Sequence, residues 1–227
     1  MRVTGCGLHI QFMSGAKTFI IGDIHGCLDL LKRLLDKIAW SPERDSLIFL
    51  GDYIDRGKDP KGVVDYILDL NILSSRIECL KGNHEAMFQD FLSGRDRDTF
   101  LVNGGWKTLE SYGNTIILDQ GYVIPPDHRA FYDSLKLYIE LEDHYVVHAG
   151  FRPGLKVEEQ TEEDMLWIRK TFIYSDYDFG KKVVFGHTPF HEPLIMENKI
   201  GLDTGAVYGN RLTCLELPEG TFHSVEA

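Results

Sequence analysis

Short apolar runs that end at a glycine or a polar residue recur along the chain. Six of them precede an Asp, an Asn or a His, and they are Phe19–Ile21, Leu47–Leu50, Cys79–Leu80, Tyr145–Val147, Val183–Phe185 and Ile200–Leu202. Runs this short and apolar are typical of buried β-strands. Because open α/β sheets gather ligands beyond the carboxyl ends of their strands, the pattern predicts polar side chains that converge at such an edge.

Amphipathic stretches separate several of these runs. Leucines and an isoleucine keep three-to-four spacing over residues 28–38, and Asp59 followed by a proline is typical of a helix start. Thr161 and Asp164 form a capping-box pattern before a helical stretch that reaches Phe172. Strands that alternate with helices in the first half predict βαβ units and therefore an α/β fold.

The second half of the chain predicts antiparallel pairs. Residues 137–141 and 145–148 flank a polar turn, and residues 206–208 and 212–217 flank a Gly-Asn-Arg turn. A short polar turn between two apolar runs is typical of a β-hairpin. We therefore expect two hairpins here and, with the first half, sheets of mixed direction.

Composition and charge narrow the class of protein. The 227 residues are 43% hydrophobic and show no repeat or linker, so we expect one domain over residues 17–227 after a flexible lead-in over residues 1–16. A formal net charge of -11 disfavours binding to nucleic acid or to anionic membranes. No apolar run approaches the roughly 18 residues that span a bilayer. The 4 scattered cysteines form no CxxC pair, which predicts free thiols and a cytoplasmic location.

The polar residues that follow the apolar runs form a candidate ligand set. Its members are Asp23, His25, Asp52, Asn83, His148 and His187. Carboxylate, imidazole and amide oxygen together suit a borderline divalent ion such as manganese, iron or zinc better than magnesium or calcium. The set exceeds the needs of one tetrahedral ion, whereas two ions about 3.5–4 Å apart that share one carboxylate would use it all.

Other residues in the same segments fit the chemistry of phosphate esters. Arg56 offers a planar guanidinium group that matches phosphate oxygens. His84 follows a candidate ligand without being needed as one, which leaves it free for proton transfer, and Asp55 could orient its ring. The remaining histidines, among them His128, lack a strand-end context, and we expect them at the surface.

Three segments resemble those of a known family. Gly22–Gly26 reads GDIHG, Gly51–Gly57 reads GDYIDRG and Gly82–Glu85 reads GNHE. In this order they resemble the signature segments of the calcineurin-like metallophosphoesterases and, more narrowly, of the phosphoprotein phosphatase family. The resemblance extends over residues 18–217, and the Asn103–Gly105 segment is similar to the bacterial and phage branch.

The resemblance implies a fold and a metal centre. The fold is α/β, with a central β-sandwich of mixed sheets flanked by helices and a site at the carboxyl ends of the strands. Two divalent ions would be the cofactors, with manganese expected first and iron, zinc, nickel or cobalt as alternatives. The implied ligands are Asp23 and His25 for the first ion, Asp52 as the bridge, and Asn83, His148 and His187 for the second.

The resemblance also implies a reaction. Arg56 and Arg169 would bind the phosphate, and a metal-bridging hydroxide would attack in line. His84, paired with Asp55, would be the general acid for the leaving oxygen. The implied substrates are phosphoproteins or phosphopeptides carrying phosphoserine or phosphothreonine. No segment matches the docking surfaces of eukaryotic members, so no regulatory subunit is implied.

Two alternatives stay open at this point. A dinucleoside polyphosphate hydrolase would keep the same chemistry and change the substrate. A non-catalytic metal-binding scaffold would keep only the fold, which the complete ligand set together with His84 disfavours.

Overall fold

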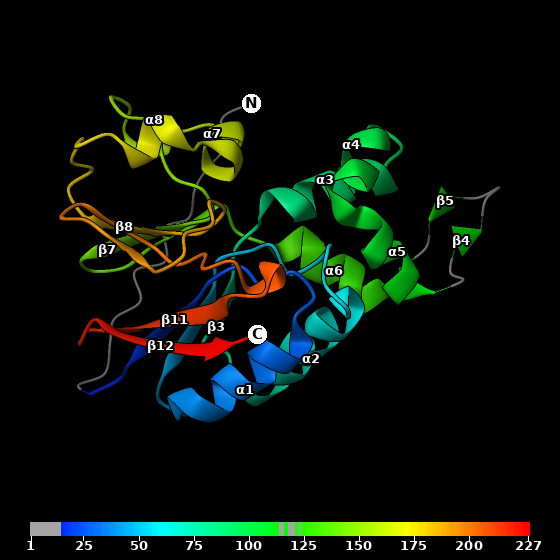
Figure 1. Ribbon diagram of the computed structural model, residues 1–227, viewed down its shortest axis with the longest axis horizontal. Helices are drawn as coiled ribbons and strands as arrows, with labels where there is room; N and C mark the ends of the chain where they lie inside the picture. The colour runs from blue at the N-terminus through cyan, green and yellow to red at the C-terminus, as the bar shows by residue number, and fades with distance from the viewer. Residues whose placement is uncertain (1–14, 114–115, 118–120, 123) are drawn as a thin grey trace.

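Two five-stranded sheets form the centre of the protein, as the computed structural model shows (Figure 1). The structure describes residues 15–113, 116–117, 121–122 and 124–227. The predicted lead-in over residues 1–16 lies outside the described residues except for its last two positions. Within the described residues, no helix is both long enough and apolar enough to cross a membrane.

The first sheet has the strand order β12-β11-β1-β2-β3. Its strands are β1 (Thr18–Ile21), β2 (Ser46–Phe49), β3 (Ile77–Cys79), β11 (Arg211–Leu217) and β12 (Thr221–Glu226). Strands β1, β2 and β3 are parallel and are connected through α1 (Leu28–Ile38) and α2 (Pro60–Leu73), which are the predicted βαβ units. Strand β11 is antiparallel to both β1 and β12, so the sheet is mixed.

The second sheet has the strand order β6-β7-β8-β10-β9. Its strands are β6 (Tyr138–Glu140), β7 (His144–Val147), β8 (Lys182–Phe185), β9 (Leu194–Ile195) and β10 (Lys199–Gly201). Strands β6 and β7 form the first predicted hairpin, whereas β7, β8 and β10 are parallel. A separate ladder joins β4 (Ile116–Ile117) to β5 (Gly121–Tyr122).

The remaining helices are shorter and lie around the two sheets. They are α3 (Asn83–Leu92), α4 (Asp98–Phe100), α5 (Trp106–Tyr112), α6 (Pro126–Ser134), α7 (Glu162–Trp167) and α8 (Lys170–Ile173). Single turns are η1 (Leu101–Gly105), η2 (Val157–Glu159) and η3 (Ala206–Tyr208). Local capping explains two of the starts. The Asp59 carboxylate accepts from the backbone N–H of Gly62 at 2.9 Å, and the Thr161 hydroxyl accepts from that of Asp164 at 3.1 Å.

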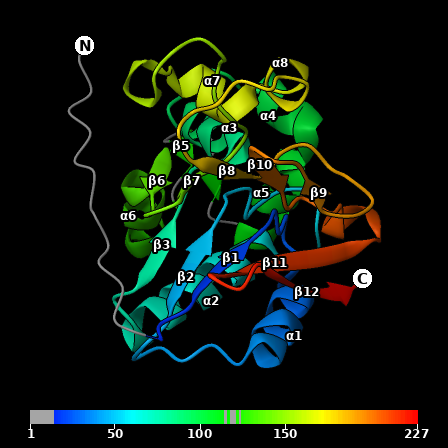
Figure 2. The same ribbon diagram turned by 90° about the vertical axis from the view of Figure 1, so that its left-hand side faces the viewer.

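The layers run helix, sheet, sheet, helix, with α1 and α2 below the first sheet and α7 and α8 above the second (Figure 2). Because side chains alternate along a strand, Phe19 and Ile21 pack against the helices below while Ile20 faces the second sheet. Ile20 meets Val146 and Val184 in the apolar layer between the sheets. The predicted α/β sandwich of two mixed sheets with flanking helices is confirmed.

Two local predictions are wrong. Residues 206–208 form the 3-10 turn η3 rather than a strand, because Gly205 and Gly209 on either side adopt φ values of 70° and 85° that interrupt an extended chain. The helix predicted to reach Phe172 also breaks. Ile168 is extended with ψ at 142°, and Arg169 lies between α7 and α8 with φ at -133°.

Candidate metal and phosphate site

The predicted site residues come from both sheets. Asp23, Asp52 and Asn83 follow β1, β2 and β3 of the first sheet, whereas His148 and His187 follow β7 and β8 of the second. All five are buried. The carboxyl ends of five strands therefore meet at one place in the sandwich, which is where the strand pattern predicted a site.

One group of candidate ligands surrounds the side-chain oxygen of Asn83. That oxygen lies 3.0 Å from Nε2 of His148 and 2.8 Å from Nδ1 of His187. A carboxylate oxygen of Asp52 lies 3.5 Å from the same nitrogen of His148. Asp52, His148 and His187 each present a ligand atom, and these atoms lie within 4.8 Å of one another.

The imidazole of His148 presents a lone pair to this group. Its Nδ1 donates to the carbonyl oxygen of Leu50 at 2.9 Å, and burial lowers the pKa of His148, so the ring is neutral and Nε2 carries no proton. Two acceptors, Nε2 of His148 and Oδ1 of Asn83, then face each other at 3.0 Å. A cation between them would remove this repulsion.

A second group surrounds the other oxygen of Asp52. That oxygen lies 3.4 Å from Nε2 of His25, and His25, Asp52 and His84 offer ligand atoms within 4.8 Å of one another. Nδ1 of His25 donates to the carbonyl of Ile54 at 2.8 Å, so Nε2 of this ring also presents a lone pair. The Arg56 guanidinium donates to this Nε2 at 2.8 Å, so a positively charged group contacts the lone pair of His25.

Asp23 stands next to these groups without belonging to either of them. One of its carboxylate oxygens accepts from the backbone N–H of His187 at 2.9 Å. The other is buried and has no hydrogen-bond partner among the described residues. Burial, followed by the charges of Asp203 and Asp52, raises the pKa of Asp23. An unpartnered buried carboxylate oxygen is costly unless a cation or a donor reaches it.

The donor set fits divalent cations. Burial lowers the pKa of His25 to about 3 and that of His187 to about 2, so both imidazoles are neutral, which is the form that binds metal. Burial alone would raise the pKa of Asp52, but the charges that His148 and His84 carry when protonated lower it overall, so the carboxyl ionises before those rings lose their protons. The set therefore combines neutral nitrogens, an ionised carboxylate and the unpartnered oxygen of Asp23.

His84 belongs to a buried hydrogen-bonded chain. Its Nδ1 lies 2.6 Å from a carboxylate oxygen of Asp55. The hydroxyl of Thr108 donates to the other oxygen of Asp55 at 2.5 Å and accepts from its backbone N–H at 3.0 Å. Burial disfavours the protonated form of His84. The charge of Asp52 and the hydrogen bond to Asp55 outweigh this effect and raise the pKa of His84. The chain orients a histidine able to carry a proton.

Thr108 and Glu85 also belong to the site, although the sequence motifs assigned them no role. Thr108 lies on α5, 53 residues from Asp55, and no local pattern marks it. Glu85 ends the third signature segment, which was the available signal. Its carboxylate accepts from the backbone N–H groups of Asp52, Tyr53 and Gly82, each at 2.9 Å. Burial and the charge of Asp52 raise the pKa of Glu85 to about 8. Glu85 thus connects the loop after β2 to the loop after β3.

Both candidate phosphate-binding arginines lie at the site. Arg56 donates to His25, and its guanidinium lies 5.7 Å from the ring centroid of Tyr208. Arg169 donates from Nε to Nε2 of His187 at 3.0 Å. Arg169 lies in the break between α7 and α8, where the chain leaves helical geometry.

The backbone of the site is unusual. Among the described residues, six positions other than glycine have positive φ, and five of them are site residues. These five are His25 at 45°, Asp52 at 51°, Asp55 at 69°, Arg56 at 65° and His187 at 65°. Such conformations are costly for residues with a Cβ and persist where the surroundings over-determine them. The fold therefore uses part of its stability to direct these side chains.

The surface position expected for His128 is wrong. This ring is 1% exposed. Its Nδ1 lies 2.6 Å from the hydroxyl of Tyr112, and its Nε2 lies 2.8 Å from a carboxylate oxygen of Asp65. The Tyr112 hydroxyl lies 3.0 Å from that of Tyr132. These partners lie on α2, α5 and α6, so the network joins three helices.

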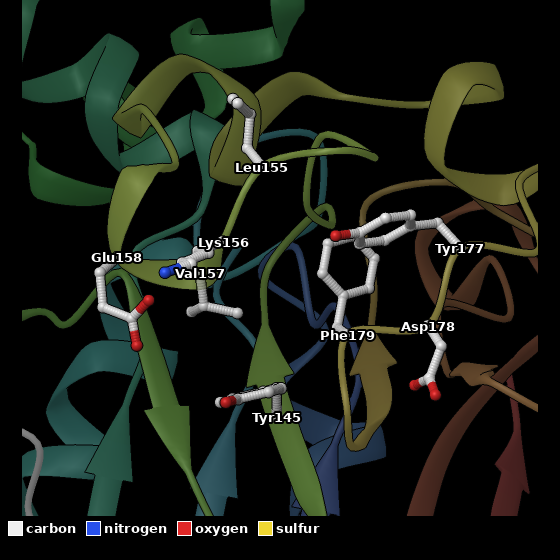
Figure 3. A pocket seen from close by; sticks show the side chains of 8 residues that line it. All are labelled: Tyr145, Leu155, Lys156, Val157, Glu158, Tyr177, Asp178 and Phe179. Carbon is white, nitrogen blue, oxygen red and sulfur yellow. The ribbon is translucent and has the colours of Figure 1, made fainter.

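A separate cavity opens on the second sheet (Figure 3). Its volume is about 170 Å³, and its lining residues are Tyr145, Leu155, Lys156, Val157, Glu158, Tyr177, Asp178 and Phe179. The lining contains none of the predicted ligands and neither arginine. This cavity is therefore distinct from the candidate metal site.

Known proteins resemble the chain over nearly its whole length. The sequence profile of the family described as calcineurin-like phosphoesterase matches residues 16–212. A bis(5'-nucleosyl)-tetraphosphatase PrpE (asymmetrical) of Oceanobacillus iheyensis is 28% identical over an alignment of 234 positions, which covers 92% of each chain. A serine/threonine-protein phosphatase 1 of Salmonella typhimurium is 28% identical over 210 residues, covering 90% of this chain and 93% of the other.

A solved structure has a similar fold. A candidate diadenosine tetraphosphatase superposes with a TM-score of 0.75 at 24% identity, covering 96% of each chain. At this identity the likeness extends to the fold alone. The two sequence relatives carry different substrate names at the same identity, so the comparisons leave the substrate open.

Proposed function

The chain belongs to the calcineurin-like phosphoesterase family, and from this premise we propose that it is a metal-dependent protein phosphatase acting on phosphoserine and phosphothreonine. The observation that carries the proposal is the buried chain of His84, Asp55 and Thr108. An oriented histidine is a general acid that can protonate a leaving oxygen. Loss of a serine or threonine alkoxide, which is strongly basic, gains most from such an acid.

The candidate ligands would hold two divalent ions, with manganese as the proposed metal. One would lie against Asp23, His25 and Asp52, and the other against Asp52, Asn83, His148 and His187. When bound, such ions supply positive charge to phosphate oxygens and lower the pKa of a water molecule to about 7.

The protein's own groups would bind the ester and deliver a proton. The Arg56 and Arg169 guanidinium groups lie beside His25 and His187 and present planar donors to phosphate oxygens. Nδ1 of His84 is engaged by Asp55, which leaves Nε2 for the leaving oxygen. Two arginines also offset the acidity of the chain, which would otherwise repel a phosphate dianion.

A second candidate function has specific support. A relative named as a bis(5'-nucleosyl)-tetraphosphatase matches as well as the one named as a serine/threonine phosphatase. A dinucleoside polyphosphate would use the same metal site, but its leaving group is a phosphate anion. Such a group is weakly basic and needs little help from an acid.

The effect of replacing His84 distinguishes the two candidate substrates. We would compare kcat/KM on a phosphoserine peptide and on diadenosine tetraphosphate, for the wild type and for His84→Asn. A protein phosphatase should prefer the peptide and lose roughly 10²–10⁴-fold in kcat on it in His84→Asn. The exposed His191 provides the matched control, and His191→Asn should leave both activities unchanged.

The outcome decides between the two functions. Preference for diadenosine tetraphosphate, with little effect of His84→Asn, would replace the protein phosphatase proposal by the nucleotide one. Absence of turnover of either substrate and of para-nitrophenyl phosphate, with manganese added, would refute both.

A further inference from the structure

Lys199 is a buried lysine on β10 without a carboxylate partner. The residue is 1% exposed, and among the described residues it makes no salt bridge, although the charge of Asp176 acts on it from a distance. Nζ donates to the carbonyl oxygens of Phe172 at 2.7 Å and Ser175 at 2.5 Å, and it lies 3.5 Å from that of Ile173. The same atom lies 4.5 Å from the centroid of the Phe172 ring.

These acceptors lie at the carboxyl end of α8. The last carbonyl groups of a helix lack partners within the helix and carry partial negative charge, so a cation placed there stabilises the end. Burial of an ammonium group is costly, and its retention calls for a compensating role. Helix α8 has only four residues, which is too short to be stable alone. Its position therefore depends on anchors such as Lys199.

The opposite end of α8 leads to the candidate site. The carbonyl of Arg169 accepts from the backbone N–H groups of Phe172 at 3.0 Å and Ile173 at 2.9 Å. The side chain of Arg169 in turn donates to His187, which follows β8. One helical turn thus separates the carbonyl groups held by Lys199 from the arginine at the site.

Strand pairing closes this connection into a frame. Strands β8 and β10 are parallel neighbours, with Lys199 opposite Val183. The frame runs from β10 through Lys199 to α8, then through Arg169 and His187 to β8, and returns to β10 through the ladder. A displacement of α8 would therefore be transmitted to Arg169 through these bonds.

We propose that Lys199 is the positioning residue for Arg169, holding α8 so that this guanidinium points into the site. The inference rests on the proposed function, because it assumes that Arg169 binds substrate phosphate. An arginine gains most from its phosphate contact when its direction is fixed before binding. The frame fixes the direction of Arg169 through Lys199, a residue that lies outside the site.

A double-mutant cycle tests the proposal. We would measure kcat/KM on para-nitrophenyl phosphate with manganese for the wild type, Lys199→Met, Arg169→Ala and the double variant. Arg169→Ala should lose roughly 10–100-fold, the range for charge-assisted hydrogen bonds. Lys199→Met should lose roughly 5–10-fold alone but less than about 2-fold when Arg169 is already absent, because it acts through Arg169. Equal losses in both backgrounds would overturn the proposal.

A control separates positioning from general destabilisation. Lys181 donates to the carboxylate of Glu140 at 2.8 Å and to the carbonyl of Leu141 at 2.6 Å, so it also ties a strand of the second sheet. It makes no contact with α8 among the hydrogen bonds of the described residues. Lys181→Met should lower the urea midpoint without changing kcat/KM. A loss of kcat/KM in Lys181→Met equal to that in Lys199→Met would overturn the proposal.

A crystallographic comparison gives a readout independent of activity. In Lys199→Met we expect α8 to shift and the 3.0 Å contact between Arg169 Nε and His187 Nε2 to be lost. An unchanged contact would overturn the proposal even if the enzyme is active, whereas an inactive wild type would refute only the proposed function. If Lys199→Met does not fold, Lys199→Gln, which keeps a donor on a shorter stem, takes its place in every arm.

Discussion

Replacement of Thr108 by valine isolates a single buried hydroxyl. Valine has nearly the shape of threonine, so packing on α5 should persist while both hydrogen bonds to Asp55 are lost. Thr108 and Asp55 are each 0% exposed, so water cannot readily replace the hydroxyl. The change should therefore lower stability and also release the carboxylate that orients His84.

The magnitude follows from the groups left without partners. A buried backbone N–H that loses its acceptor costs about 1–3 kcal/mol, and a hydrogen bond to a charged group contributes about 1.5–3 kcal/mol. Together these predict a fall of about 2.5–6 kcal/mol in the free energy of unfolding. At about 2–4 °C per kcal/mol for a protein of this size, Tm should fall by roughly 5–24 °C.

Urea denaturation and calorimetry would measure the change, with Thr108→Ser as the matched control. Serine keeps the hydroxyl and loses one methyl group, which should cost about 1 kcal/mol. Thr108→Val should also lower kcat on a phosphoserine peptide more than Thr108→Ser does. If the two variants differ by less than about 0.5 kcal/mol in stability, the hydroxyl does not hold Asp55 as described.

Three further changes have definite expected results. Asp52→Asn should lower both metal occupancy and rate because it removes the charge shared by the two ligand groups, and full occupancy by elemental analysis would contradict this. A Cβ at Gly57 would lie 1.9 Å from the carbonyl oxygen of His25. Gly57→Ala should therefore displace the loop that contains Gly57, lower the free energy of unfolding by about 1–3 kcal/mol and weaken metal binding. An unchanged urea midpoint would argue against such a clash. Burial would raise the pKa of the Asp45 carboxyl, but Arg44 and two backbone amides lower it overall. Its stabilisation should therefore be complete above about pH 4 and fade as pH falls through the folded-state pKa, so Asp45→Asn should flatten the acid-side fall of the urea midpoint, and a fall as steep as that of the wild type would count against the assignment.

The fold was predictable where one local rule decides. A buried strand followed by glycine and a polar residue placed β1, β2 and β8 correctly, and Asp59 marked the start of α2 through its own side chain. The turn at residues 206–208 was not predictable from periodicity, because two flanking glycines in left-handed conformations override the apolar pattern. The break at Ile168 and Arg169 has no proline or glycine to announce it.

The candidate site was also predictable only where a local sequence pattern marks a residue. The sequence nominated the strand-end residues, and the structure brings them together, although their roles stay predictions. Thr108, Lys199 and His128 escaped because their partners are distant in sequence: Asp55 is 53 residues from Thr108, and Asp65 is 63 residues from His128. Local patterns carry no information on such pairings, which only the packing of helices and sheets determines.

The two sheets share one ligand group, since Asp52 and Asn83 extend from the first and His148 and His187 from the second. An ion held by all four would cross-link the halves of the sandwich and resist their sliding apart. Metal supply would then set the lifetime of the protein as well as its activity. Chains without metal would open more often between the two sheets and would be degraded first by cellular proteases.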